Sequence, residues 1–142
     1  MSKLSLFLKK NKKQRENVKY VATKSLCDEN GNPLEWTIKP LTTAESEDIR
    51  ESCTREIQVT GKPNVYRNKF DDRKYIAKLI ASSVVEPNLY DKELQDSYGV
   101  MTPEELIVQM IDDPNEYNNF VEFITNNIGN NNINKEIEEA KN

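Results

Sequence analysis

The residues that come closest to a metal site are Asp28, Asn30 and Asn32, which alternate like the first ligands of a calcium-binding loop. Such a loop needs a glycine at its sixth position and a bidentate glutamate at its twelfth. Counted from Asp28, Gly31 stands at the fourth position and Lys39 at the twelfth. The stretch is therefore predicted to be a turn and not a calcium site.

Other catalytic and cofactor-binding chemistry finds little support. The chain has no histidine, which excludes Ser–His and Cys–His nucleophiles and leaves only a Ser–Lys pair open. Cys27 and Cys53 match no metal-ligand spacing and are expected to be reduced, part-buried thiols. The four glycines lie too far apart for a glycine-rich phosphate loop. Neighbouring carboxylates at Asp71–Asp72 and Asp112–Asp113 favour helix N-termini. We expect no catalytic residue, no cofactor and no bound metal.

Charge is unevenly distributed along the chain. Residues 1–24 hold eight lysines and arginines against one glutamate, so they carry +7, and the rest carries −11 because the total is −4. A basic arm can bind nucleic acid, with Trp36 and Tyr20 stacking on bases. However, the last helix of the C-terminal pair carries Glu116 and Glu122 where a recognition helix should be basic. We expect no nucleic-acid partner; the arm can pair with an acidic partner or with the body of the chain itself.

The first forty residues are predicted to form a short helix and a hairpin. Residues 3–16 place Leu4, Phe7 and Leu8 on one side of an amphipathic helix. Apolar residues then alternate in two runs around Asn30-Gly31, a dipeptide typical of hairpin turns because both residues tolerate positive φ. The residues expected on the inner side are Val18, Tyr20, Ala22, Leu26, Leu34, Trp36 and Ile38.

After Pro40 the apolar spacing changes from two to three or four, which indicates helices. Thr42 and Glu45 fit a T-x-x-E capping box that opens a helix through about Ile57. Residues 59–68 are predicted to be a loop. The helix that begins at the capping box has a thin apolar face, which consists of Ile49, Cys53 and Ile57.

The remaining helices follow at short intervals. Residues 71–85 are predicted to form an amphipathic helix that ends before Pro87, and residues 88–99 a short helix closed by Gly99. Two further helices begin with the same order of cap, proline and glutamate, at Thr102, Pro103, Glu105 and again at Asp113, Pro114, Glu116. The last helix should end at Gly129 and bury the stripe Tyr117, Phe120, Val121 and Ile124.

These elements predict a single α+β domain: an N-terminal helix and β-hairpin followed by a mostly helical C-terminal bundle of four to five short helices. We place the domain at residues 1–129, with a basic arm at 1–16 and a flexible Asn- and Glu-rich tail at 130–142. No apolar run approaches the roughly 18 residues of a membrane span. We therefore expect a cytoplasmic protein without membrane contact.

Residues 84–124, "VVEPNLYDKELQDSYGVMTPEELIVQMIDDPNEYNNFVEFI", resemble the C-terminal signature of XkdN-like phage tail assembly chaperones. The pieces "EPNL", "ELQDSYGV", "PEEL" and "NEY" stand in the order and spacing of that family, which occurs in long-tailed phages and PBSX-like elements of Gram-positive bacteria. The layout of "FLKKNKKQRENVKY", "DENGNP" and "EWTIKPLTTAE" is also similar. The resemblance extends over about residues 4–129.

The resemblance implies a non-enzymatic chaperone in the host cytoplasm. It would bind and solubilise the tape measure protein, help to recruit tail tube subunits and be absent from the mature tail. The alternative is a structural component, such as a tube connector or terminator, that stays in the particle.

Two surfaces are candidates for the partner site: a groove between the last helices, and the N-terminal stripe with its lysines. A homo-oligomer is a further expectation. For the partner site we select Leu4, Phe7, Leu8, Lys9 and Lys10.

Overall fold

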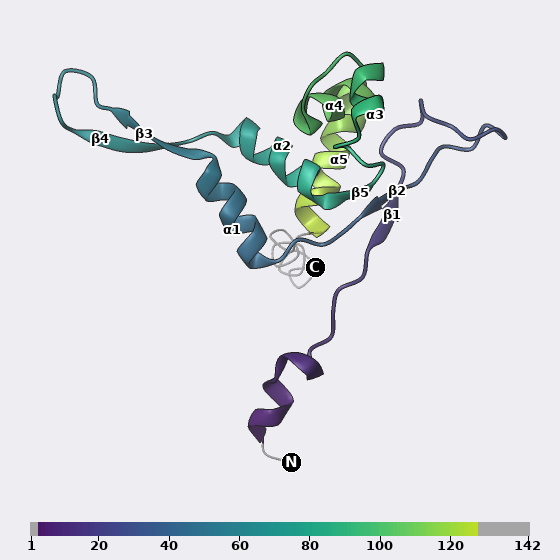
Figure 1. Ribbon diagram of the computed structural model, residues 1–142, viewed down its shortest axis with the longest axis horizontal. Helices are drawn as coiled ribbons and strands as arrows, with labels where there is room; N and C mark the ends of the chain where they lie inside the picture. The colour runs from purple at the N-terminus through teal and green to yellow at the C-terminus, as the bar shows by residue number, and fades with distance from the viewer. Residues whose placement is uncertain (1–2, 128–142) are drawn as a thin grey trace, which may run out of the picture.

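The computed structural model describes residues 3–127, which form five α-helices, two short 3-10 helices and five β-strands (Figure 1). The strands make a three-stranded sheet and a separate two-stranded hairpin. The predicted α+β class is thereby confirmed. The predicted end of the last helix at Gly129, the domain boundary after residue 129 and the tail at 130–142 lie outside the described residues.

The three-stranded sheet consists of β1 (Val18–Tyr20), β2 (Trp36–Ile38) and β5 (Val84–Glu86) in the order β1-β2-β5. All neighbours are antiparallel, and Val18 lies opposite Ile38 while Tyr20 lies opposite Trp36. The predicted hairpin is therefore confirmed. The prediction that the helix beginning at residue 71 continues to residue 85 is wrong at its end, because Val84 leaves the helix to pair with β2.

The connection between β1 and β2 contains the turn that resembled a calcium loop. One carboxylate oxygen of Asp28 accepts hydrogen bonds from the N–H groups of Asn30 and Asn32, each at 2.9 Å. Gly31 has a φ of 84°, whereas Asn30, which also tolerates a positive φ, does not adopt one. The carboxylate of Asp28 therefore holds the turn itself, which confirms the prediction of a turn. Leu34, expected on the inner side, is 43% exposed.

The N-terminal segment differs from the helix predicted over residues 3–16. It forms two short 3-10 helices, Lys3–Phe7 and Lys9–Asn11, neither of which buries a residue. An isolated helix of this length is marginal in water, and like charges one turn apart weaken it further. Figure 1 shows that the segment projects away from the body and reaches β1 through an extended stretch.

Helix α1 (Thr43–Ser52) begins at the predicted capping box. The Thr42 hydroxyl accepts from the N–H of Glu45 at 3.1 Å, and the Glu45 carboxylate accepts from the N–H of Thr42 at 3.1 Å. The helix ends at Ser52, so the prediction that it continues to Ile57 is wrong. Because Ile49, Cys53 and Ile57 are spaced by four, the same residues satisfy both a helical and an alternating pattern.

The chain after α1 forms a second hairpin where a helix end and a loop were predicted. Its strands are β3 (Thr54–Gln58) and β4 (Tyr66–Phe70), paired antiparallel with Arg55 opposite Lys69. Gly61 and Asn64 in the turn have positive φ values of 77° and 66°. Glycine and asparagine adopt this conformation at the lowest cost, which allows the chain to reverse here.

The remaining helices are α2 (Asp72–Ser83), α3 (Lys92–Ser97), α4 (Pro103–Met110) and α5 (Pro114–Asn127). The side chains of Asp71, Asp91 and Thr102 cap the N-termini of α2, α3 and α4. The predicted cap at Thr102 and the predicted helix N-terminus at Asp71 are confirmed, whereas the cap at Asp91 was not predicted. The reciprocal contacts predicted for Glu105 and Glu116 are not found. The Glu105 carboxylate accepts from the N–H of Met101 at 3.5 Å, and Glu116 bonds to a distant segment.

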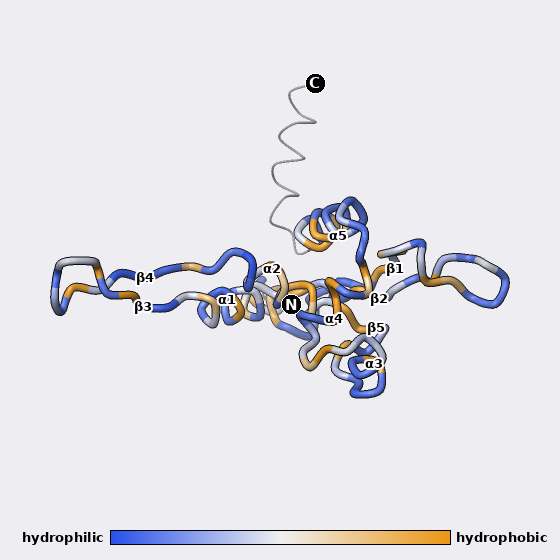
Figure 2. Tube along the Cα trace, turned by 90° about the horizontal axis from the view of Figure 1, so that it is seen from above, coloured by the Kyte–Doolittle hydropathy of each residue, from blue (hydrophilic) through white to orange (hydrophobic). Residues whose placement is uncertain are grey.

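The hydrophobic core lies between the three-stranded sheet and the helices α2, α4 and α5. Phe120 of α5 is fully buried; its ring meets Trp36 edge-on and stacks against Tyr20, both at 5.6 Å between ring centroids. Figure 2 shows the two hairpin regions extending outward at opposite ends of this core. The largest fully buried side chains include Trp36, Ile38, Leu41, Leu79, Ile80, Leu89, Leu106, Ile107, Ile111, Phe120 and Ile124.

A polar contact reinforces the same junction. The two carboxylate oxygens of Glu116 accept one hydrogen bond each, from the hydroxyl of buried Thr23 and from the N–H of Lys24, both at 2.8 Å. Glu116 therefore ties the segment after β1 to the first turn of α5, and does not close a capping box as predicted.

Replacing Thr42 with alanine removes the hydroxyl that caps α1, so we expect the free energy of unfolding to fall by about 1 kcal/mol in urea denaturation. Thr43→Ala is the matched control, because Thr43 is exposed and does not provide the cap. It should change the free energy of unfolding by less than about 0.5 kcal/mol. Equal losses in both variants would contradict the assignment of the cap.

Replacing Glu116 with glutamine keeps the shape of the side chain but removes one of its two acceptor oxygens. Either the Thr23 hydroxyl or the Lys24 N–H then loses its acceptor, and we expect a loss of about 1–3 kcal/mol in the free energy of unfolding. Glu122→Gln, an exposed position on the same helix, is the control and should unfold like the original protein. Identical urea midpoints for all three proteins would show that this contact does not stabilise the fold.

Candidate functional site: partner-binding surfaces

The N-terminal arm exposes an apolar cluster within its described part, residues 3–16. Leu4, Leu6, Phe7 and Leu8 are 73%, 61%, 78% and 46% exposed. The predicted partner-site residues Lys9 and Lys10 follow directly and are also exposed. All five predicted residues thus lie on one projecting segment.

Leu6 was missed by the sequence analysis. A helix of 3.6 residues per turn places Leu6 away from the stripe of Leu4, Phe7 and Leu8, whereas the short 3-10 helix leaves it exposed with them. The run "LSLFL" contained the signal, because its four apolar residues exceed what a thin stripe needs.

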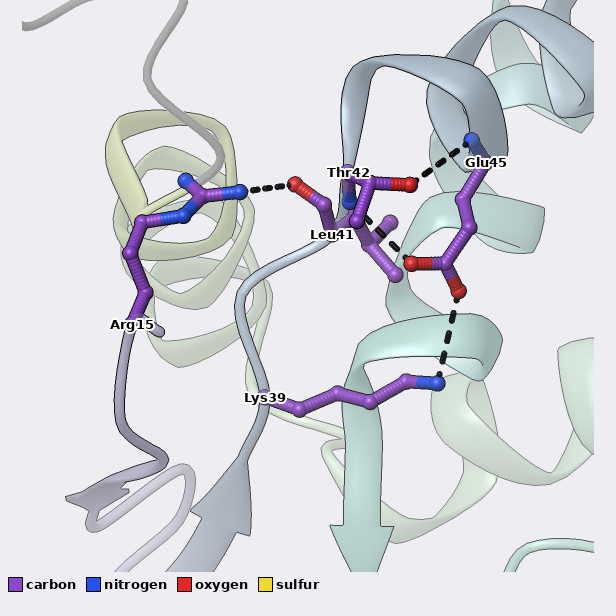
Figure 3. Close-up of polar contacts among 5 residues, drawn as sticks. All are labelled: Arg15, Lys39, Leu41, Thr42 and Glu45. Carbon is purple, nitrogen blue, oxygen red and sulfur yellow. Dashed lines mark hydrogen bonds and ion pairs between the residues drawn. The ribbon is translucent and has the colours of Figure 1, made fainter. Parts of the chain in front are cut away.

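The arm is anchored where it joins the body. The guanidinium of Arg15 donates to the main-chain carbonyl of Leu41, next to the capping box of α1 (Figure 3). Further along, the Lys19 ammonium donates to the Thr37 hydroxyl at 2.6 Å. These contacts hold the extended stretch against β2 and the start of α1, so that the residues before Arg15 point away from the sheet.

The same corner contains the only ion pair among residues 3–127, between Lys39 and Glu45 at 3.5 Å. The pKa of Glu45 lies below its usual value, chiefly because its carboxylate accepts the N–H of Thr42, with smaller contributions from the Thr42 hydroxyl and Lys39. The carboxylate therefore stays ionised at neutral pH, and the anchor of the arm stands beside an intact capping box.

A groove between α2, α4 and α5 is the second candidate surface. It has a volume of about 480 Å³ and is lined mainly by apolar side chains, among them Ile76, Val108, Tyr117 and Val121. Burial raises the pKa of the Tyr117 hydroxyl. Its α4 and α5 side corresponds to the groove between the last helices that was the alternative partner site in the sequence, while α2 forms its other side.

A second groove lies between β2, β5 and α3, and we call it the β2–β5–α3 groove. Its volume is about 280 Å³, and its apolar lining includes Leu34, Leu94 and Tyr98. Glu35 and Glu86 line it as well, and both are exposed. This groove was not predicted from the sequence, because the pattern of residues 84–86 did not indicate the strand β5.

The structure also places the residues considered for metal binding and for base stacking, and the two cysteines. In the described part of the chain, no group of three or more acidic or cysteine residues is arranged to hold a metal ion. Trp36 is 2% exposed and Tyr20 stacks on Phe123 at 4.1 Å, so neither ring is available to stack on a base. Cys53 is a buried free thiol, whereas Cys27 is an exposed one, against the prediction of partial burial.

None of the helices in the described part of the chain is both long enough and apolar enough to span a membrane.

Comparison with known proteins identifies the family. The model of the phage XkdN-like tail assembly chaperone family (TAC) matches residues 4–141. The chain belongs to this family. The resemblance noted from residues 84–124 is thereby confirmed, and the family points to a role in assembly and not in catalysis.

Two relatives from Bacillus subtilis (strain 168) align over 118 residues, which is 83% of this chain and 78% of each relative. The phage-like element PBSX protein XkdN is 26% identical, and the uncharacterized protein YqbN is 25% identical. The crystal structure of YqbN superposes with a TM-score of 0.74 at 21% identity, covering 91% of this chain and 98% of that one. At this identity the structural match supports the fold alone.

Because the arm buries nothing on the body, we expect the combined Leu4→Ser, Phe7→Ser and Leu8→Ser variant to keep its free energy of unfolding within about 0.5 kcal/mol. Phe120→Ala, in the core, should by contrast lose about 3–5 kcal/mol in the same urea titration. A loss above about 1 kcal/mol in the arm variant would mean that the arm packs on the body.

Proposed function

We propose that this protein binds the tape measure protein of its phage or phage-like element during tail assembly. It keeps the tape measure protein soluble and helps to recruit tail tube subunits around it. It acts in the cytoplasm of the bacterial host and is not retained in the mature tail. The proposal refines the assembly role of the family by naming the partner.

The observation that supports a binding role is the exposed apolar arm. Phe7 is 78% exposed and Leu4 is 73% exposed on a segment that projects from the body (Figure 1). Contiguous exposed apolar side chains on a soluble protein mark an interaction site. The neighbouring lysines, Lys9 and Lys10, would contact acidic side chains beside an apolar stripe on the partner.

A long helical tape measure protein would expose apolar stripes that aggregate unless they are covered. The arm supplies apolar contact, while the acidic body, residues 25–142 with a net charge of −11, adds charge that opposes aggregation. Each contact is small, so binding is reversible, and strength comes from repetition along a long partner. A chaperone that must leave when the tube closes requires contacts that are individually weak and that are repeated along the partner.

The test is co-expression with the tape measure protein from the same gene cluster. We expect this chain to move the tape measure protein from the pellet to the supernatant and to co-purify with it. The Leu4→Ser, Phe7→Ser and Leu8→Ser variant should lose at least about 90% of that solubilised fraction, because the apolar contact is removed. Met101→Ser, at an exposed position outside the arm, is the control and should retain activity.

Val108→Asp tests the groove between α2, α4 and α5 in the same assay, since Val108 lines that groove and is 46% exposed. Loss of solubilisation in this variant alone would move the partner site from the arm to the groove. If the tape measure protein stays insoluble with the original chain, the proposed partner is wrong. Mass spectrometry of purified tails tests the alternative, because a connector or terminator would be present in stoichiometric amount.

A further inference from the structure

The hairpin of β3 and β4 is a positively charged projection from an acidic protein. Residues 54–70 contain four lysines and arginines against one acid, Glu56. The strands pair only with each other, and Figures 1 and 2 show the hairpin extending from α1 and α2 at one end of the long axis. At its base the guanidinium of Arg50 lies 4.5 Å from the ring centre of Phe70.

The strand register places three of the four cations, all except Lys62 of the turn, on a single face of this hairpin. Arg55 lies opposite Lys69, and Arg67 lies opposite Ile57. The pairing continues beyond the strands, since the N–H of Val59 donates to the carbonyl of Val65 at 2.8 Å. Residues directly opposite one another project from the same face of an antiparallel pair. This cationic face consists of Arg55, Ile57, Val59, Val65, Arg67 and Lys69.

The cationic face is electrostatically unbalanced. Like charges directly opposite one another, such as Arg55 and Lys69, destabilise a strand pair. Glu56 lies opposite Asn68 and therefore projects from the other face. None of the cations makes an ion pair with a carboxylate of residues 3–127. An acidic surface that covers this face would relieve the repulsion, and the aliphatic residues between the cations require that surface to be partly apolar.

The β2–β5–α3 groove is complementary to the cationic face, because it combines apolar side chains with negative charge. It is apolar in its lining and carries Glu35 and Glu86. The segment from β5 to the end of α5, residues 84–127, contains ten acids and one lysine, a net charge of −9. In both Figures 1 and 2 the elements β2, β5 and α3 lie away from the hairpin, on the far side of α1 and α2, so the hairpin does not meet the groove of its own chain.

We propose that the cationic face of one copy docks in the β2–β5–α3 groove of a second copy. The two surfaces are different and lie on opposite sides of α1 and α2, so the contact is head-to-tail and each bound copy presents a free hairpin or groove to the next. Such contacts build an open chain of subunits. The interleaved aliphatic residues, and the absence of an aromatic ring from the cationic face, favour a protein surface over nucleic acid.

Because this contact needs no other protein, it is tested on the purified full-length chain and is independent of binding to the tape measure protein. Sedimentation velocity over a concentration series should show assemblies that grow beyond dimers and weaken as salt is added. A hairpin variant, Arg55→Glu with Arg67→Glu, should weaken association by about tenfold or more. A groove variant, Glu35→Lys with Glu86→Lys, should do the same.

The decisive measurement is a mixture of these two variants. Each retains one original surface, so the original hairpin of the groove variant meets the original groove of the hairpin variant, and the reversed surfaces also attract one another. Association should therefore return on mixing. Gln58→Glu adds negative charge to the opposite face of the same hairpin, across from uncharged Tyr66, and is the control that should associate normally. Circular dichroism and urea titration verify that each variant is folded.

Four results would overturn the proposal. The original chain could remain monomeric at every concentration, or the mixture could remain as weak as its components. Association could be lost in the Leu4→Ser, Phe7→Ser and Leu8→Ser variant while both charge-reversal variants associate normally, which would assign self-association to the arm. The hairpin variant could instead lose a salt-sensitive gel shift with DNA or RNA while the original chain stays monomeric, which would make the cationic face a nucleic-acid surface.

Discussion

The packing of Phe120 against Tyr20 and Trp36 is the interaction on which the rest of this structure depends. Strands of three residues do not hold a sheet by themselves, and each helix offers only a narrow apolar face. Phe120 joins the last helix to the first hairpin, and Glu116, one turn earlier on α5, adds two hydrogen bonds to the same junction. Truncating a buried phenylalanine costs about 3–5 kcal/mol, a large part of the total stability of a domain.

This arrangement separates the parts that fold the protein from the parts available for binding. The core takes its large apolar side chains from the sheet and from α2, α4 and α5, and the arm contributes none of them. The arm and the β3–β4 hairpin project from the body on short connections anchored by Arg15 and Arg50. Apolar and basic side chains can therefore stay exposed on both segments without loss of the core, as reversible binding requires.

Several elements were predictable because their signals are local. The capping box of Thr42 and Glu45, the cap at Thr102 and the turn at Asp28 each depend on residues within four positions. The strands β3, β4 and β5 were not predicted, because their signals are not local. Residues spaced by four, such as Cys53 and Ile57, fit a helix as well as a strand. The strand β5 forms by pairing with β2, which lies far away in the sequence, so its own residues do not predict it.

The sequence by itself determined the fold class, most of the helices and the family, because periodicity, capping residues and a specific run of motifs are properties of neighbouring residues. Only the tertiary structure decided which apolar residues are left exposed, since burial depends on what the rest of the chain covers. In the folded chain Trp36 and Phe120 are buried in the core, whereas Leu4, Phe7 and Leu8 are exposed to solvent. The groove beside β5 and the cationic face of the hairpin likewise required strand pairing, because register places distant residues side by side, and local spacing carries no information about register.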